Sequence, residues 1–185
     1  GWYISHFGFS VNNPPQDLKV IQVFDKSYSR TTNSMPTVSP DNKSIIIRGR
    51  KDGADVIRIY SLHEFDSHKS DLSNLKGIEW KINREFTKDD FAFQAITASN
   101  KYIYILSGGG NIKPKRLFVY DFSGELISKF PSVTLGWGKA ANSGIEQHWE
   151  PEGLSFDIAS HELLIAFAIG DKNNRKALVY FLPVT

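Results

Sequence analysis

The sequence repeats a pair of short apolar strands three times, and this repeat constrains the fold more than any other feature. β-Branched and aromatic residues fill each run, and Gly, Asn, Asp or Pro bound it, which is the pattern of a β-hairpin. The best helix candidate, 64–75, has a weak apolar face and many Ser and Asp residues, so we expect at most one or two helical turns there. The predicted hairpins pair 44–49 with 56–62, 101–106 with 117–122, and 162–168 with 177–182.

The three hairpins also recur as a set, at intervals of about 60 residues. Ile46, Tyr104 and Ile165 occupy equivalent places in them, and each hairpin follows a turn of similar chemistry. A further short strand is predicted before each turn, and a fourth extended segment follows each of the first two hairpins. The preceding strands are predicted at 35–39, 91–97 and 152–156, and the fourth segments at 77–86 and 126–130.

Four antiparallel strands per repeat predict an all-β fold, a β-propeller of four-stranded blades. A sandwich of two sheets also has short alternating strands, but it does not explain why turn, hairpin and preceding strand recur together. We expect about three blades in this chain, as part of a larger propeller. The predicted blades are 35–86, 90–130 and 150–184, with 1–34 completing a neighbouring blade.

The composition limits the classes of function. The 22 basic and 20 acidic residues nearly cancel and neither sign forms a long block, which argues against a nucleic-acid partner. The longest apolar run, 163–169, is far shorter than the roughly 20 residues that cross a bilayer, so we predict no membrane span. The absence of cysteine excludes disulfides and thiolate chemistry. No signal peptide is visible, although one could have been removed before Gly1.

The segment 147–154 is the most distinctive in the chain, because it places a histidine, a tryptophan and two carboxylates around one proline. In an extended segment Glu150 and Glu152 project to the same side. If the segment opens an innermost strand, both carboxylates lie at the mouth of a central channel. There they could bind sugar hydroxyls, hold a hard cation with water, or act as an acid/base pair. The alternative is that they pair with Arg or Lys and close the channel structurally.

The predicted ligand-binding residues are therefore His148, Trp149, Glu150 and Glu152, with Trp137 on an adjacent loop. The two tryptophans can pack on the apolar face of a sugar ring, or they can wedge between blades as core residues. We predict no catalytic residue, no metal ligand and no cofactor, because the histidines lack the helical pair spacing of a zinc site and no nucleophile elbow occurs. The glycine-rich run 107–111 leads into a strand, so it predicts a hairpin loop and not a phosphate cradle.

Three stretches of the chain resemble the C-terminal half of helveticin J-type class III bacteriocins. They are the SPDNK turn at 39–43 with its hairpin to 62, the FQAI strand at 93–96 with the strand to 105, and EPEGL at 150–154 with the final hairpin. The resemblance implies a secreted bacterial protein that acts on the envelope of related bacteria. Similar propellers occur among phage and cell-wall proteins that recognise teichoic acid or surface glycans.

Together these observations predict a secreted, antibacterial propeller that recognises a bacterial surface glycan or a teichoic-acid-like polymer. We expect it to be a binding protein and not an enzyme. Two alternatives stay open. One is an enzyme that cleaves a carbohydrate or phosphate ester with a metal or a carboxylate pair, and the other is an inert scaffold for protein–protein interaction. Because closed propellers usually need at least four blades, we also expect a partner that closes the ring: a missing propeller segment, a second chain or another copy.

Overall fold

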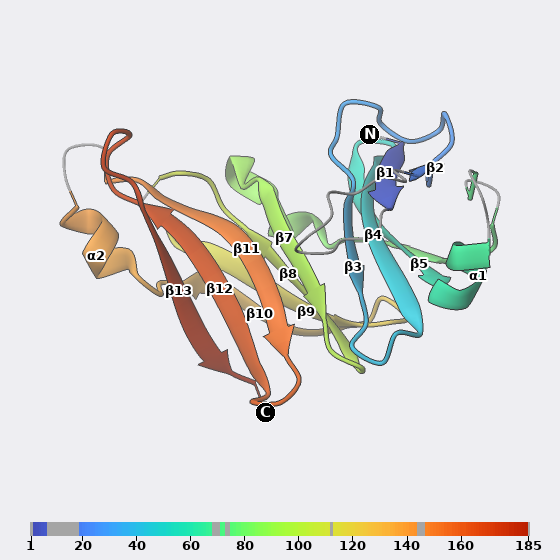
Figure 1. Cartoon of the computed structure of the whole chain (residues 1–185). Helices are drawn as coiled ribbons and strands as arrows, with labels where there is room; N and C mark the ends of the chain where they lie inside the picture. Colours follow the sequence, from blue (N-terminus) through green and yellow to red (C-terminus); the bar gives the residue numbers. More distant parts are fainter. Residues whose placement is uncertain are drawn as a thin grey trace. The chain divides into compact units, whose positions relative to one another are not determined.

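The computed structural model describes residues 2–6, 19–67, 71–72, 75–111, 113–143 and 147–184. Strands dominate this part of the chain, and every pair of neighbouring strands is antiparallel. The chain divides into two compact units, Gly1–Ile82 and Asn83–Thr185 (Figure 1). The predicted all-β class with four-stranded antiparallel sheets is confirmed.

The first unit contains a four-stranded sheet whose strands lie in chain order. The strands are β3 (Met35–Val38), β4 (Ser44–Lys51), β5 (Ala54–Ser61) and β6 (Ile78–Lys81). A separate two-stranded sheet pairs β1 (Tyr3–His6) with β2 (Lys19–Gln22), and a short helix, α1 (Leu62–Ser67), follows β5. The six residues of α1 agree with the expectation of no more than two helical turns near this position.

The second unit contains two sheets, again with their strands in chain order. The first sheet consists of β7 (Phe93–Ala98), β8 (Tyr102–Ser107), β9 (Lys115–Asp121) and β10 (Leu126–Val133). The second consists of β11 (Trp149–Asp157), β12 (Glu162–Ile169) and β13 (Lys176–Pro183). Two 3₁₀ helices, η1 (Arg84–Phe86) and η2 (Lys88–Asp90), precede β7, and helix α2 (Trp137–Ala141) lies between β10 and β11.

In each of the three larger sheets, the turn between the first two strands is held by its opening side chain. The hydroxyl groups of Ser39 and Ser99 accept hydrogen bonds from the backbone N–H groups of Ser44 and Tyr102, each at 3.0 Å. In the third sheet the carboxylate of Asp157 accepts backbone hydrogen bonds in the same way. Short polar side chains that bond to a nearby backbone favour turns over helix or strand. The similar chemistry seen in the sequence therefore reflects one structural role repeated three times.

The core of the second unit lies between its two sheets. Every second residue of β12, beginning with Leu163, is buried, because alternate side chains of a strand point to opposite faces. Leu163, Ile165 and Phe167 pack in one apolar cluster with Leu106 and Leu117 of the neighbouring sheet. The first strands of the two sheets, β7 and β11, lie next to each other. Residues near the starts of these two strands can therefore meet.

The strands predicted for the three larger sheets correspond to the observed ones and differ only at their ends, whereas β1 and β2 were not predicted. β11 begins at Trp149, before the predicted start at 152, and the segment predicted at 77–86 ends its strand at Lys81 because η1 follows. The assignment of the three sheets to blades of one ring stays a prediction. Part of the predicted segment 1–34, namely 1 and 7–18, lies outside the described residues.

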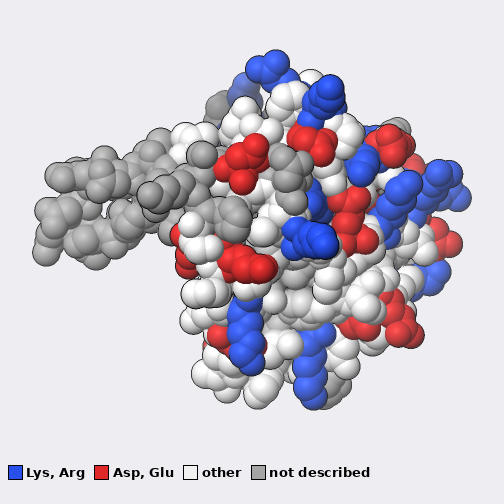
Figure 2. All heavy atoms as spheres, turned by 90° about the vertical axis from the view of Figure 1, so that its right-hand side faces the viewer, with Lys and Arg blue, Asp and Glu red and all other residues white. Residues whose placement is uncertain are grey.

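The surface charge shown in Figure 2 is mixed in sign. On this face of the molecule, Lys and Arg side chains lie among Asp and Glu side chains, and among the coloured residues neither sign forms one continuous patch. This agrees with the near balance of 22 basic and 20 acidic residues in the sequence.

Candidate functional site

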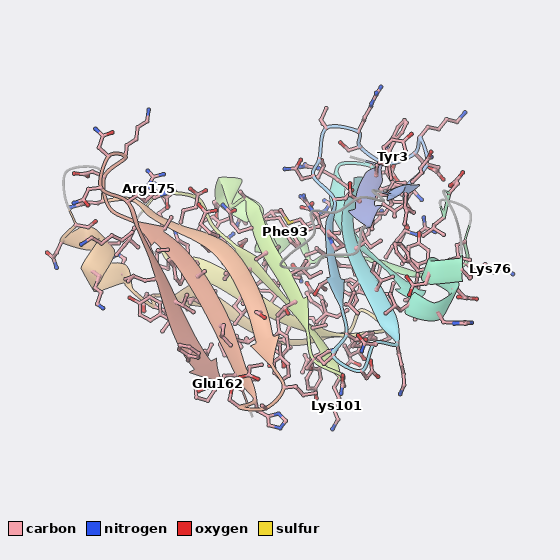
Figure 3. All side chains as sticks on the ribbon, viewed as in Figure 1. Tyr3, Lys76, Phe93, Lys101, Glu162 and Arg175 are labelled. Carbon is pink, nitrogen blue, oxygen red and sulfur yellow. The ribbon has the colours of Figure 1, made fainter. Side chains whose placement is uncertain are left out.

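Four of the five predicted binding residues, His148, Trp149, Glu150 and Glu152, lie around the start of β11, beside the start of β7, and the fifth, Trp137, begins α2. The loop that joins β8 to β9 reaches the same place, because the backbone N–H of Trp149 donates a hydrogen bond to the carbonyl oxygen of Gly110 at 3.3 Å. In Figure 3, Phe93 marks this end of the second unit, and Lys101 and Glu162 mark the opposite end, where the turns into β8 and β12 lie. Three segments that are distant in sequence thus meet at one end of the unit.

Four side chains form what we call the polar cluster: Gln94, Lys115, His148 and Glu150. The Oε1 atom of Glu150 accepts a hydrogen bond from Gln94 Nε2 at 3.0 Å, and its Oε2 atom lies 3.1 Å from His148 Nε2. The imidazole N–H is not aligned for a hydrogen bond, so this second contact is electrostatic and attractive when the imidazole is protonated. Gln94 Nε2 also donates to the Gly108 carbonyl at 2.7 Å. Both oxygens of the Glu150 carboxylate are therefore occupied by protein groups.

Lys115 is the fully buried cation of the polar cluster. Its Nζ donates hydrogen bonds to the carbonyl oxygens of Gly109 at 2.8 Å and Asn111 at 2.6 Å, and lies 4.5 Å from the centre of the Trp149 ring. Burial lowers the pKa of Lys115 to about 8, against an opposing attraction from the negative charge of Glu150. The ammonium group fastens the β8–β9 loop and is not open to an incoming anion.

Gly110 is required where the loop crosses His148. A Cβ atom at Gly110 would lie 2.4 Å from His148 Cε1, well inside any allowed contact. Only glycine lets a backbone approach a ring this closely. The loop backbone, the imidazole and Glu150 are thus packed against one another, although the Glu150 side chain stays 29% exposed.

Trp149 is a core residue. Its side chain is fully buried, its Nε1 donates to the carbonyl oxygen of Leu135 at 3.1 Å, and its ring stacks on Phe167 with 5.5 Å between centres. With Lys115 over the ring as well, the indole offers no face to a sugar in this arrangement. The structure therefore shows the packing alternative for this tryptophan.

Glu152 and Trp137 differ from the rest of the predicted site because both are exposed. The pairing of β11 with β12 shifts between Pro151 and Gly153, which leaves Glu152 in a β-bulge. Strict alternation fails across a bulge, so the sequence argument that Glu150 and Glu152 share one side does not apply here. Trp137 begins α2 and is 44% exposed. The structure thus divides the five predicted residues into a packed set and an exposed pair, and their binding role stays a prediction.

Comparison with known proteins identifies the family. The model of the phage five-bladed β-propeller receptor-binding platform domain matches residues 12–181. The chain belongs to this family. The match confirms the predicted β-propeller but does not support a bacteriocin identity. Of what the resemblance to helveticin J-type bacteriocins implied, the match therefore supports only the fold. No curated protein matches the chain.

Among the residues that the structure describes, no group of three or more His, Asp and Glu side chains is placed to hold a metal ion. The described helices are also all too short or too polar to cross a membrane.

Sequence reasoning missed two members of the polar cluster, Gln94 and Lys115. Gln94 lies inside a predicted strand, and Lys115 follows a loop that was predicted only to connect two strands. A lysine that closely precedes the apolar run 117–120 is the one local signal that was present. Its burial could not be inferred, because the groups that surround it come from the loop before β9 and from β11.

Proposed function

We propose that this domain recognises a receptor on the bacterial surface, and that the receptor is a glycan or a teichoic-acid-like cell-wall polymer. The observation that carries the proposal is membership in a family of receptor-binding platform domains. The exposed pair at the start of β11 and α2 supports the choice of ligand. A carboxylate such as Glu152 accepts hydrogen bonds from sugar hydroxyls, and the indole face of Trp137 can pack on the apolar face of a pyranose.

In this proposal the packed residues support the exposed ones. The hydrogen bonds and contacts of Glu150, Lys115 and Trp149 hold the β8–β9 loop against the start of β11. A segment that is already ordered loses little conformational freedom when a ligand binds, so more of the contact energy appears as affinity. Glu152 then contacts the ligand, while His148, Trp149 and Glu150 keep the bulge that carries it in place.

Binding to isolated cell walls tests the proposal. We expect the labelled chain to cosediment with walls from a panel of Gram-positive bacteria, and less so after teichoic acid is removed. The double variant Glu152→Gln/Trp137→Ala should bind at least about tenfold more weakly, equivalent to about 1.4 kcal/mol. Glu162→Gln is the matched control, because it makes the same chemical change at the opposite end of the unit (Figure 3).

Each outcome of the wall-binding assay has a distinct meaning. Failure of the wild-type chain to bind any wall contradicts the proposed function. Full binding by the double variant, with the native thermal transition retained, leaves the function in place but contradicts the residue assignment. Turnover of wall polymer that is abolished by chelation favours the enzyme alternative, and wall-independent capture of an envelope protein favours the scaffold alternative.

Two finer predictions from the sequence are also proposals here. The first is a partner that closes the ring, for which we expect another copy of the chain, a second chain or a further propeller segment. A native mass above 20.9 kDa for the purified chain supports another copy. The second is secretion with bacteriocin-like antibacterial action, which growth inhibition by the purified chain tests directly.

A further inference from the structure

A groove of about 480 Å³ lies between the two sheets of the second unit, and none of the four side chains of the polar cluster lines it. Strand β10 and the residues after it form one wall, and the end of β13 forms the other. Leu117 and Leu163, both fully buried, lie at its base. The volume falls within the range of roughly 300–1,000 Å³ that is usual for small-molecule sites, and an apolar base with a few polar groups is the usual composition.

The polar side chains that line this groove all carry hydroxyl groups. Ser128, Ser132 and Thr134 line it from the β10 side and are exposed, and Tyr102 lines it from β8. Among the described residues, no hydrogen bond uses the side-chain hydroxyls of the three β10-side residues. Each hydroxyl can donate and accept, so together they can bond to a ligand that also carries hydroxyls. We call this feature the hydroxyl groove.

The lining of the hydroxyl groove contains no charged side chain. An anion placed against its apolar base would lose hydration and gain no counter-charge, which is costly. A neutral ligand avoids this penalty. The groove therefore selects against phosphate and carboxylate groups.

Phe130 supplies an apolar surface at the rim of the groove. Its ring is 50% exposed, although it belongs to a strand of the sheet. An exposed aromatic ring beside hydroxyl groups matches a pyranose, which has an apolar ring face and hydroxyls at its edge.

The irregular pairing of β10 explains how these residues come to line the groove. The register of β10 against β9 shifts between Leu126 and Ser128 and again between Phe130 and Val133. Pro131 lies in the second irregular stretch, and its lack of an N–H confines it to such edge positions. A bulge re-aims the side chains around it. Ser128 and Phe130 thus lie between the two irregularities, and Ser132 lies inside the second one.

We propose that the hydroxyl groove binds one uncharged sugar residue, with the ring face on Phe130 and the sugar hydroxyls on Ser128, Ser132 and Thr134. The inference rests on the proposed function, because it names the part of a surface polymer that this groove would hold. It adds a second contact region to the exposed pair at Glu152 and Trp137. Charged groups of the same polymer stay outside the groove.

Binding of free monosaccharides to the full chain tests the inference. Saturation-transfer NMR with methyl α-glucopyranoside and N-acetylglucosamine should show binding, and glucuronic acid, which has a similar size and a negative charge, should bind at least about tenfold more weakly. Phe130→Ala should weaken binding of the neutral sugars at least about tenfold, and Ser132→Ala/Thr134→Val should also weaken it. Phe181→Ala is the matched control, because Phe181 is 59% exposed on β13 and lies outside the groove lining.

Three results would overturn the inference: no binding of either neutral sugar, equal binding of glucuronic acid, or unchanged binding by Phe130→Ala. A native mass that falls in Phe130→Ala without sugar binding in the wild-type chain would show that the groove joins two copies instead. The two proposals remain separable. Wall binding without sugar binding contradicts only the groove, and sugar binding without wall binding contradicts only the proposed function.

Discussion

The polar cluster and the hydroxyl groove lie in the same unit, but their polar groups differ in what satisfies them. In the cluster, protein atoms take both oxygens of the Glu150 carboxylate and hold the ammonium group of Lys115. In the groove, the hydroxyls of Ser132 and Thr134 have no hydrogen-bond partner among the described residues. The comparison shows that residues that stand out in a sequence can have a structural role. Common serines and threonines, in contrast, can keep hydroxyl groups that are available to a ligand.

The difference has a simple physical origin. A buried charge needs partners, because an ion removed from water without compensation costs several kcal/mol. A hydroxyl at a rim keeps its hydration until a ligand replaces it. Substitutions in the cluster should therefore change stability first, and substitutions in the groove should change binding with little effect on stability.

The largest expected effect compares Trp149→Ala with Phe130→Ala. Trp149 is fully buried and its loss should lower the free energy of unfolding by about 3–5 kcal/mol. Phe130 is half exposed, so its loss should cost less than about 1 kcal/mol. Urea denaturation of the two variants measures both values. If both substitutions lower the free energy of unfolding equally, the distinction between a packed polar cluster and an exposed groove is contradicted.

A smaller effect is expected from Gly110→Ala, with Gly138→Ala as its control. The new methyl group at Gly110 would collide with the His148 ring, and overpacking of this kind usually costs about 1–3 kcal/mol. Gly138 lies in α2 with no atom near its Cβ position, so alanine there should be neutral or slightly stabilising. The midpoint of thermal unfolding of the two variants measures the difference in their stability. A Gly110→Ala protein as stable as the control would show that the loop does not press on His148.

The smallest effect is a pH dependence that belongs to Lys115. Its pKa is lowered to about 8 by burial, so the folded chain releases this proton at a lower pH than the unfolded chain, whose lysine has a pKa near 10.5. Stability should therefore rise, relative to Lys115→Met, as the pH increases from about 8 toward 10, by about 1–2 kcal/mol. Denaturation of both proteins at several pH values in this window gives the difference. The free energy of unfolding of the groove variant Thr134→Val should change with pH in the same way as that of the wild-type chain. If the free energy of unfolding of Lys115→Met also follows the wild-type pH dependence, the interpretation of Lys115 as a buried cation is contradicted.

Sequence reasoning succeeded where the signal was local. The turn at Asp52 and Gly53 has positive φ at both residues, as a two-residue hairpin requires, and that pair alone indicated it. The strands of the three larger sheets were recognised in the same way, from apolar runs bounded by turn residues. Polar side chains do gather at the start of β11, but Trp149 belongs to the core and the bulge at Glu152 breaks the alternation that was expected to place it beside Glu150. Whether the five residues bind a ligand stays a prediction.

The sequence by itself determined the all-β class, the order of the strands and the chemistry of the turns, because backbone preferences and side-chain alternation act over a few residues. Only the tertiary structure decided which polar groups are buried and which are open. The hydrogen bond between Gln94 and Glu150 joins residues 56 positions apart, and the hydroxyl groove takes its walls from strands of two different sheets. Whether a charge is enclosed or a hydroxyl is left free depends on these distant neighbours, and no local pattern encodes them.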